Sequence, residues 1–106
     1  MSKFLIQATY TLQGVQGLQS DGGSGRRDAV AKAVESVGGQ LETFYFGFGE
    51  QDAYAIADLP DNEAAAALVL AVNAAGGAVA RTVVLLTPEE VDAAAKRSVG
   101  YSAPGA

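Results

Sequence analysis

The 106-residue sequence contains no cysteine and no histidine. Without cysteine, the protein can form no disulfide, thiolate nucleophile, zinc–sulfur site or iron–sulfur cluster. Without histidine, it lacks the most frequent general base, the most frequent haem ligand and the commonest ligand of transition metals. We therefore expect no metal site and no cofactor. Any catalytic proton transfer would fall to a carboxylate with a raised pKa.

Charged residues are few, and most of them are negative. Seven Lys and Arg oppose twelve Asp and Glu, which gives a net charge of −5 at pH 7. A surface with this balance repels nucleic acid and anionic membranes. No apolar run approaches the ~20 residues of a membrane span, and the first residues enter a strand pattern without the regions of a signal peptide. We expect a cytoplasmic protein that binds neither nucleic acid nor membranes.

Tryptophan is absent and aromatic residues make up only 8% of the chain, although 49% of it is hydrophobic. This is enough apolar material for the core of a single domain over residues 1–106. Alanine fills 21 positions and glycine 13, and such small side chains bury little area each. We expect a domain of this size and composition to gain part of its stability by association.

Hydrophobic periodicity and turn signals predict the order β-α-β-β-α-β followed by a terminal helix. The order predicts an α+β, ferredoxin-like fold, with a four-stranded antiparallel sheet, both main helices on one face and a C-terminal helix. Expected helix caps are Ser24, Asp61 and Thr87, the last in a capping box with Glu90. The predicted strands are residues 3–10, 40–48, 53–59 and 78–86, and the predicted helices are residues 25–37, 62–73 and 88–98, with a helical turn near 15–18.

Alternation within the strands sorts the side chains between the two faces of the sheet. We expect Phe4, Ile6, Phe44 and Phe46 to face the helices, with Phe48 on the same side of its strand. The opposite face is left open and is too apolar to remain in water as a large patch. We therefore expect it to form the contacts of a homo-oligomer, the wall of a ligand pocket, or both. The residues expected on this open face are Leu5, Gln7, Thr9, Leu41, Thr43 and Tyr45, with Arg81, Val83 and Leu85 or the residues that alternate with them in the last strand.

A series of short segments, taken together in their order and spacing, resembles the GYD-domain family of small bacterial proteins. The segments are LIQATYT at 5–11, RRDAV at 26–30, GG and LE at 38–42, FYFGFG at 44–49, DLPD at 58–61 and LLTPEE at 85–90. The name-giving Gly-Tyr-Asp corresponds to Glu50-Gln51-Asp52, so only the aspartate matches. The family is similar to the dimeric α/β-barrel group, in which two open sheets pack face to face and some members are enzymes or handle haem. The resemblance implies a homo-oligomer.

Arg26 and Arg27 lie at the predicted start of a helix, after the glycine-rich residues 21–25. Free backbone N–H groups and two arginines at such a position could bind a phosphate or carboxylate. Positive charges near a helix N-terminus interact unfavourably with the helix dipole. The presence of two arginines at this position therefore favours a functional role for them. The alternative is that they are solvated or pair with Asp21, Asp28 or a neighbouring subunit. The glycine pattern lacks the Gly-Lys-Ser/Thr of a nucleotide-hydrolysing loop.

Asp52 is the carboxylate on which the family resemblance concentrates. As a catalytic group it would act with Tyr45 and Arg81 in a mostly apolar cavity. The alternative is that an aspartate in a turn serves as a hydrogen-bonding cap. Glu42 and Asp58, which are acids in strands, are further candidates for proton acceptors. Two tyrosines, Tyr10 and Tyr54, could complete the polar cluster, whereas the spacing of Glu50 and Asp52 gives no metal signature.

The run Phe46-Gly47-Phe48-Gly49 invites comparison with RNA-recognition domains, which share this topology and stack bases on strand aromatics. Here the run lies on the second strand, no basic residue flanks it, and the net charge is negative. We therefore interpret these phenylalanines as core residues.

Three functional hypotheses remain open. The first is a homo-oligomeric protein that assembles through its open sheet face and has no demonstrated catalysis. The second is a dimeric-barrel enzyme that acts on a small organic molecule. The third is a small-anion sensor or regulatory binding module that uses Arg26 and Arg27. The second requires a cavity with polar groups, and the third requires the two arginines to converge on one point.

Overall fold

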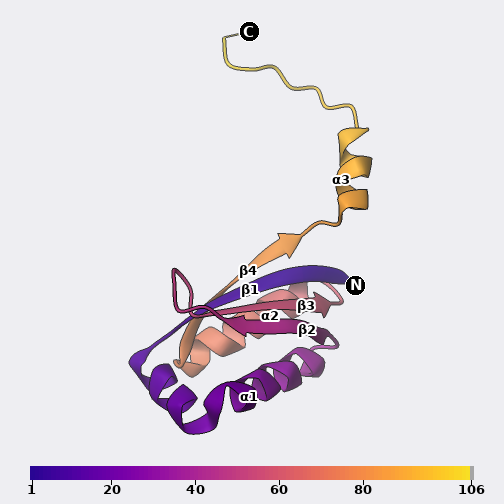
Figure 1. Cartoon of the computed structure of the whole chain (residues 1–106). Coiled ribbons are helices and arrows are strands. Elements are labelled where there is room, and N and C mark those ends of the chain that lie inside the picture. The colour runs from indigo at the N-terminus through magenta and orange to yellow at the C-terminus, as the bar shows by residue number, and fades with distance from the viewer. Residues whose placement is uncertain (106) are drawn as a thin grey trace.

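A computed structural model describes residues 1–105 and contains one four-stranded antiparallel sheet and three helices (Figure 1). The order of these elements confirms the predicted ferredoxin-like α+β fold. The elements are β1 (Ser2–Tyr10), α1 (Leu12–Ser36), β2 (Gln40–Phe46), β3 (Ala53–Leu59), α2 (Asn62–Ala75), β4 (Ala78–Leu85) and α3 (Pro88–Ala95).

The strands lie in the order β2-β3-β1-β4, and each neighbouring pair is antiparallel. Residues directly opposite one another share a face of the sheet. Ile6 of β1, for example, lies opposite Ala55 of β3 and Thr82 of β4. Both α1 and α2 cover this face, whereas no helix within residues 1–105 covers the other (Figure 1). The sheet therefore has one helix-covered face and one open face, as predicted.

The core lies between the sheet, the second half of α1 and the first half of α2. Phe4, Val34 and Leu59 are its largest fully buried side chains. Most other buried positions hold alanine, including Ala57 of β3 and Ala65 of α2. Burying a large apolar side chain stabilises a fold by about 1.5–3 kcal/mol, and a methyl group contributes much less. The core is therefore as lean as the composition predicts.

The first helix begins much earlier than predicted. We expected it to start after Ser24, but α1 begins at Leu12 and is interrupted only at Gly22, whose φ of 76° is left-handed. The cap is Thr11, whose side chain accepts a hydrogen bond from the backbone N–H of Gly14 at 3.2 Å. The prediction was wrong because each glycine lowers local helix propensity by about 1 kcal/mol, and the compensating contacts are made elsewhere in the chain.

These compensating contacts join Thr11 to the turn before β4. The Thr11 backbone N–H donates to the carbonyl of Gly77 at 3.1 Å, and its hydroxyl donates to the carbonyl of Gly76 at 2.8 Å. The start of α1 is therefore held against a segment more than sixty residues away. The pattern of apolar residues within α1 could not predict this contact, because its partners lie in a distant part of the sequence.

A β-bulge in β2 places Leu41 on the helix-covered face of the sheet instead of the open face that we predicted. Leu41 lies opposite Ala57, but Thr43 lies opposite Ile56, so the register shifts between them. Because side chains alternate along a strand, one extra residue reverses the face of those before it. The prediction that Leu41 lies on the open face was therefore wrong. Cross-strand pairing places the other residues expected on the open face where they were predicted.

The second strand ends at Phe46, so the prediction that Phe48 lies on the core side of this strand was also wrong. Phe48 is 64% exposed and has a φ of 53°. The chain turns at Gly47, whose N–H donates to the carbonyl of Asp52 at 2.9 Å and closes the loop between β2 and β3. The Phe48 ring stacks on that of Phe46, with centroids 5.8 Å apart.

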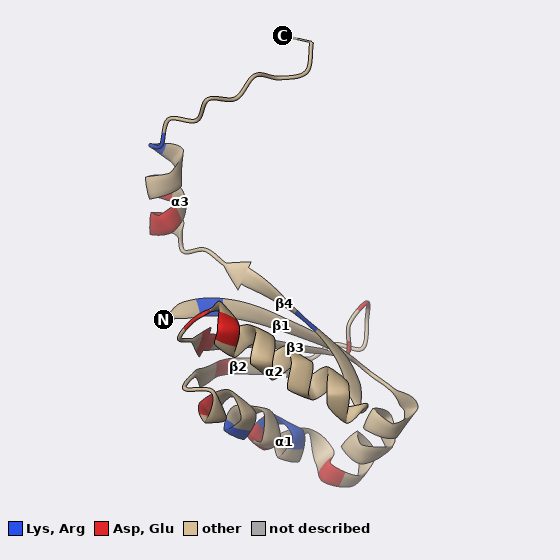
Figure 2. Cartoon of the chain, turned by 180° about the vertical axis from the view of Figure 1, so that it is seen from behind, with Lys and Arg blue, Asp and Glu red and all other residues tan. Residues whose placement is uncertain are grey.

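The C-terminal helix stands away from the sheet (Figures 1 and 2). Its predicted capping box is present, because the Thr87 N–H donates to Oε1 of Glu90 at 2.9 Å and the Glu90 N–H donates to Oγ1 of Thr87 at 3.1 Å. None of its residues is buried. The radius of gyration, 16.8 Å, exceeds the roughly 13 Å of a compact chain of this length. Within residues 1–105, no helix combines the length and hydrophobicity that a membrane crossing requires.

Candidate functional site

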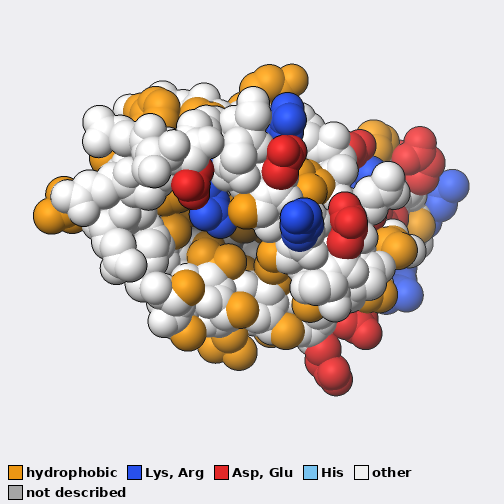
Figure 3. Space-filling model, turned by 90° about the horizontal axis from the view of Figure 1, so that it is seen from below, with side chains coloured by type: hydrophobic (Ala, Val, Ile, Leu, Met, Phe, Trp, Pro, Cys, Tyr) orange, Lys and Arg blue, Asp and Glu red, His pale blue; other side chains and the backbone are white. Residues whose placement is uncertain are grey.

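A cavity of about 440 Å³ lies between the helix-covered face of the sheet and the two helices above it. Residues of all four strands and of α1 and α2 line it. Figure 3 shows hydrophobic side chains gathered in the hollow on this side of the molecule, with charged side chains along one rim. The volume lies within the ~300–1,000 Å³ typical of small-molecule sites.

The cavity exists because alanine occupies positions where larger side chains would otherwise meet. Ala8 of β1 lies opposite Ala53 of β3 and Ala80 of β4, so methyl groups form the floor across three strands. From above, α2 contributes Ala71 and Ala75. Protein interiors are otherwise filled to high density by interlocking side chains. The same small residues that make the core lean therefore leave a space for a ligand.

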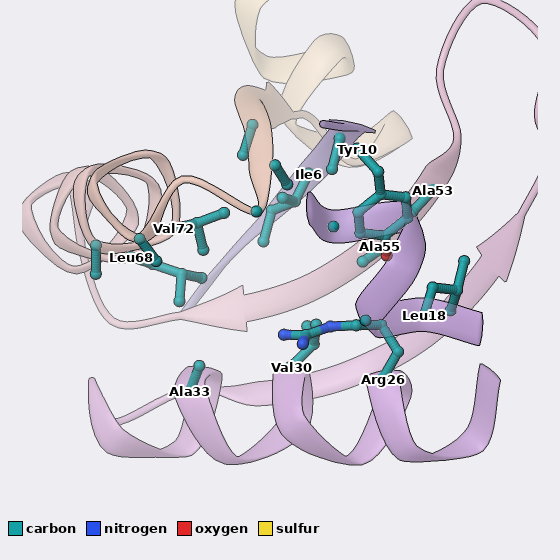
Figure 4. Close-up of a pocket in the computed structure, with 18 of the residues that line it drawn as sticks. Ile6, Tyr10, Leu18, Arg26, Val30, Ala33, Ala53, Ala55, Leu68 and Val72 are labelled. Atoms are coloured by element: carbon teal, nitrogen blue, oxygen red, sulfur yellow. The ribbon is translucent and has the colours of Figure 1, made fainter. Parts of the chain in front are cut away.

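Three polar side chains face this apolar space: Tyr10, Gln13 and Arg26. Arg26 is the only charged residue that lines the cavity within residues 1–105, and its guanidinium extends over Val30 into the space between the helices (Figure 4). Tyr10 projects from the end of β1 toward the same space (Figure 4). Arg26 is half-buried and forms no ion pair with any of the described residues.

The Tyr10 phenol has a perturbed acidity. Burial raises its pKa above the ordinary value of 10.0, the positive charge of Arg26 opposes this rise, and the negative charge of Asp52 adds to it. At neutral pH the phenol is therefore protonated and can donate a hydrogen bond into the cavity. The site combines the Arg26 cation, the neutral Tyr10 hydroxyl donor and the Gln13 amide in otherwise apolar surroundings.

Arg26 and Arg27, which the sequence singled out together, are separated by the structure. Arg27 does not line the cavity, and its guanidinium contacts Oδ1 of the adjacent Asp28 at 3.3 Å. Successive residues of a helix point about 100° apart, so the two arginines do not converge on one point. Only Arg26 is positioned to meet a ligand in the cavity.

The candidate catalytic residues Tyr45, Asp52 and Arg81 also lie apart. Tyr45 is on the open face of β2, opposite Tyr54, and is 71% exposed. Arg81 is on the open face of β4, opposite Gln7. Two strands separate β2 from β4, which puts these residues roughly 14 Å apart across the sheet. Asp52 lies at the end of the loop before β3, and none of the three lines the cavity.

The two acids in strands share one cation on the open face. Nζ of Lys3 lies 3.0 Å from Oδ1 of Asp58 and 3.3 Å from Oε2 of Glu42. The hydrogen bond that the Lys3 ammonium donates to Asp58, followed by the one it donates to Glu42, raises the pKa of Lys3. All three side chains are substantially exposed, so the cluster contributes little to stability. Within residues 1–105, no group of acidic residues is arranged to hold a metal ion.

The phenylalanines of β2 pack as a small aromatic group near the cavity. The rings of Phe44 and Phe46 meet edge to face with centroids 5.0 Å apart, and Tyr10 lies 6.5 Å from Phe46. Phe44 and Phe46 lie opposite Ala55 and Ala53, and so belong to the helix-covered face. These rings are therefore not available for stacking on the open face.

Sequence reasoning named Tyr10 and Arg26 but not the cavity that joins them. The missed lining residues include Gln13, Gly17 and Leu18, which belong to the part of α1 that was not predicted to be a long helix. One signal was available. Alanines alternate at the helix-facing positions of β3, a pattern that fills a core poorly unless something else enters it.

The fold and the cavity define a ferredoxin-like α+β protein with a cavity of small-molecule size between its helices and its sheet. The family model of the GYD domain matches residues 4–95, from the third residue of β1 to the end of α3. The chain therefore belongs to the GYD-domain family. No curated protein matches it.

Proposed function

We propose that this GYD-domain protein binds a small, largely apolar organic molecule in the cavity between α1, α2 and the sheet. One observation carries the proposal: an alanine-floored space of about 440 Å³ into which only a few polar side chains project. Small-molecule sites have this character, with apolar walls and a few polar groups that orient the ligand.

The test compares substitutions at two exposed alanines of α2, of which one lines the cavity and the other does not. Ala71 lines the cavity, whereas Ala67 does not, and both are exposed to solvent. Ala71→Phe should obstruct the space, and Ala67→Phe should place the same ring on the outer surface. Both variants should fold, because neither residue is buried.

Binding of a library of small aromatic and aliphatic compounds is measured by backbone NMR. We expect compounds to shift the resonances of Ala55 and Ala80, to lose affinity in Ala71→Phe and to retain it in Ala67→Phe. Shifts confined to open-face residues such as Thr43 and Arg81, or equal affinity in both variants, would contradict the proposal. So would the absence of any binding compound.

A second candidate function is self-association through the open sheet face, and a different observation favours it. This face carries exposed apolar side chains, with Tyr45 71%, Val79 56% and Val83 45% accessible. Ile56 and Leu5 lie between them in the sheet. Large exposed apolar patches mark contact surfaces, and a two-fold axis would let one copy cover another. The two functions are compatible because the cavity is on the other side of the sheet.

Catalysis on the bound molecule is a further alternative. Tyr10 and Arg26 are the candidate groups that could act on a molecule bound in the cavity, because both line it, whereas Tyr45, Asp52 and Arg81 lie outside it. A protonated phenol and a guanidinium can stabilise a developing negative charge on oxygen. The experiment that separates binding from catalysis is recovery of the bound compound, unchanged or altered, after prolonged incubation with the protein.

A further inference from the structure

We propose that the cavity selects small monocarboxylic acids with an apolar body, and that Arg26 binds the carboxylate. This inference rests on the proposed function of the same cavity and adds the chemical class of its ligand. It begins from Arg26, a half-buried cation that has no ion-pair partner within residues 1–105. A charge held against apolar surface without a partner is unfavourable, and an anion that enters the cavity removes this cost.

The shape of the guanidinium favours a carboxylate. Its planar fork can donate two parallel hydrogen bonds to the two oxygens of a carboxylate. Figure 4 shows the Arg26 side chain extended over Val30, so that its guanidinium faces the space bounded by Val72 of α2. The phenol of Tyr10 reaches toward the same space from β1 and can donate a third hydrogen bond.

The charge balance argues against ligands with more than one negative charge. Arg26 is the only cation lining the cavity within the described residues, and the protein as a whole carries a net charge of −5. A second acidic group would have to lie against the methyl groups of Ala8, Ala55 or Ala80, where nothing compensates its desolvation. Phosphate monoesters and dicarboxylates are therefore disfavoured.

The apolar lining of the cavity determines which chemical groups the rest of the ligand can carry. Opposite Arg26, the cavity is bounded by Ile6, Leu68 and Val72 together with alanines. These side chains offer no hydrogen-bond donor or acceptor, and Gln13 is the one further polar side chain in the described lining besides Arg26 and Tyr10. A body with many hydroxyl or amide groups would therefore lose most of its hydration without replacement. An aromatic ring or a short hydrocarbon chain gains from burial against the same walls.

The test uses pairs of probes that differ only in charge: benzoate with benzamide, phenylacetate with phenylacetamide, and octanoate with octanamide. Affinities are measured at pH 7 by titration calorimetry and by NMR. We expect each acid that binds to do so about tenfold or more tightly than its amide, because only the acid forms charge-assisted hydrogen bonds with Arg26. Inorganic phosphate, added alone, should not compete.

The matched variants are Arg26→Gln and Arg27→Gln. We expect Arg26→Gln to remove the preference for acids and to leave the affinity for amides unchanged. Arg27→Gln should change neither, because Arg27 lies outside the cavity and pairs with Asp28. Arg26→Lys, which keeps the charge but not the planar fork, should retain part of the preference and provides a second variant if Arg26→Gln does not fold.

Two failures can be distinguished. If acids and amides bind equally well in the cavity, and Arg26→Gln changes neither, the ligand class is wrong while the proposed binding function stands. If none of the six probes binds and the compound library also fails, both proposals are wrong. Displacement of the acids by phosphate would indicate a general anion site and would overturn the selectivity for carboxylates.

Discussion

The backbone N–H of Tyr10 donates a hydrogen bond to Oδ2 of Asp52 at 2.8 Å, although 42 positions separate the two residues. The Asp52 N–H in turn donates to the carbonyl of Ala8, and the Asp52 carbonyl accepts from Gly47, each at 2.9 Å. One residue thus ties the end of β1 to both sides of the loop between β2 and β3.

Replacing Asp52 should therefore weaken the fold. We expect Asp52→Ala to lower the free energy of unfolding by about 1.5–3 kcal/mol, the range for hydrogen bonds to charged groups. Asp52→Asn retains an acceptor oxygen and should cost less. Urea unfolding followed by circular dichroism measures both. Glu50→Ala, in the same loop and exposed, is the control and should stay within about 0.5 kcal/mol of the parent. An Asp52→Ala variant as stable as Glu50→Ala would disprove the structural role of this bond.

The acidity of Tyr10 provides a second prediction, because two neighbouring charges act on it in opposite directions. Burial raises the Tyr10 pKa, Arg26 lowers it and Asp52 raises it. We therefore expect Arg26→Gln to raise this pKa further and Asp52→Asn to lower it. The measurement is an ultraviolet titration of tyrosinate absorbance, with the Tyr10→Phe variant subtracted to isolate this residue from the other three tyrosines.

The same pKa shift determines how stability depends on pH. Because the folded protein holds the Tyr10 proton more tightly than the unfolded chain does, the unfolded state binds fewer protons once pH exceeds about 10, and stability falls with rising pH. The contribution is complete below pH 10 and is lost as pH rises through the folded-state pKa. Tyr10→Phe should show a weaker decline in this range. An identical decline in the two proteins would contradict the assignment.

Two glycines of α1 should respond oppositely to alanine. A Cβ at Gly14 would clash with the carbonyl of Gly77, whereas a Cβ at Gly17 would meet nothing within 4 Å. We expect Gly14→Ala to destabilise the protein by about 1–3 kcal/mol. Gly17→Ala should stabilise it by about 0.5–1 kcal/mol, because alanine favours the helix. Thermal and urea unfolding measure both changes, and equal effects would show that the start of α1 is not held against β4.

The elements that could be predicted from the sequence are those whose signals are local. Asp61 caps α2, with its side chain accepting from the Ala64 N–H at 2.8 Å, and Thr87 begins α3 in a capping box, both as predicted. Alternation along β1 placed its side chains on the right faces, because the pairing of this strand with both neighbours contains no bulge. The order of elements then allowed few topologies other than the ferredoxin-like one.

The features that could not be predicted depend on contacts between distant segments. The first half of α1 is glycine-rich and is held by the turn at Gly76 and Gly77. The bulge between Leu41 and Thr43 has no marker in the local alternation. The cavity needs alanines on three strands and on α2 to face one another. Sequence reasoning could therefore single out Arg26 as a candidate but not place it in a cavity or separate it from Arg27.

The open sheet face supplies the last prediction, because the register now fixes which side chains it presents. Thr43 lies opposite Ile56, whose other neighbour is Leu5, so a charge at position 43 would stand within the apolar centre of this face. If two copies pack through it, Thr43→Glu in each would bury two unpaired carboxylates. We expect Thr43→Glu to convert the assembly to monomers, as measured by native mass spectrometry and size-exclusion chromatography.

The matched control is Ala67→Glu, which adds the same charge to an exposed position of α2 on the opposite side of the molecule. It should leave the assembly intact, so that a general effect of added negative charge can be separated from an effect at the open face. A Thr43→Glu variant that stays assembled with unchanged stability would show that the contact lies elsewhere. A parent protein that is monomeric at all concentrations would contradict self-association through the open face that carries the exposed Val79, Val83 and Tyr45.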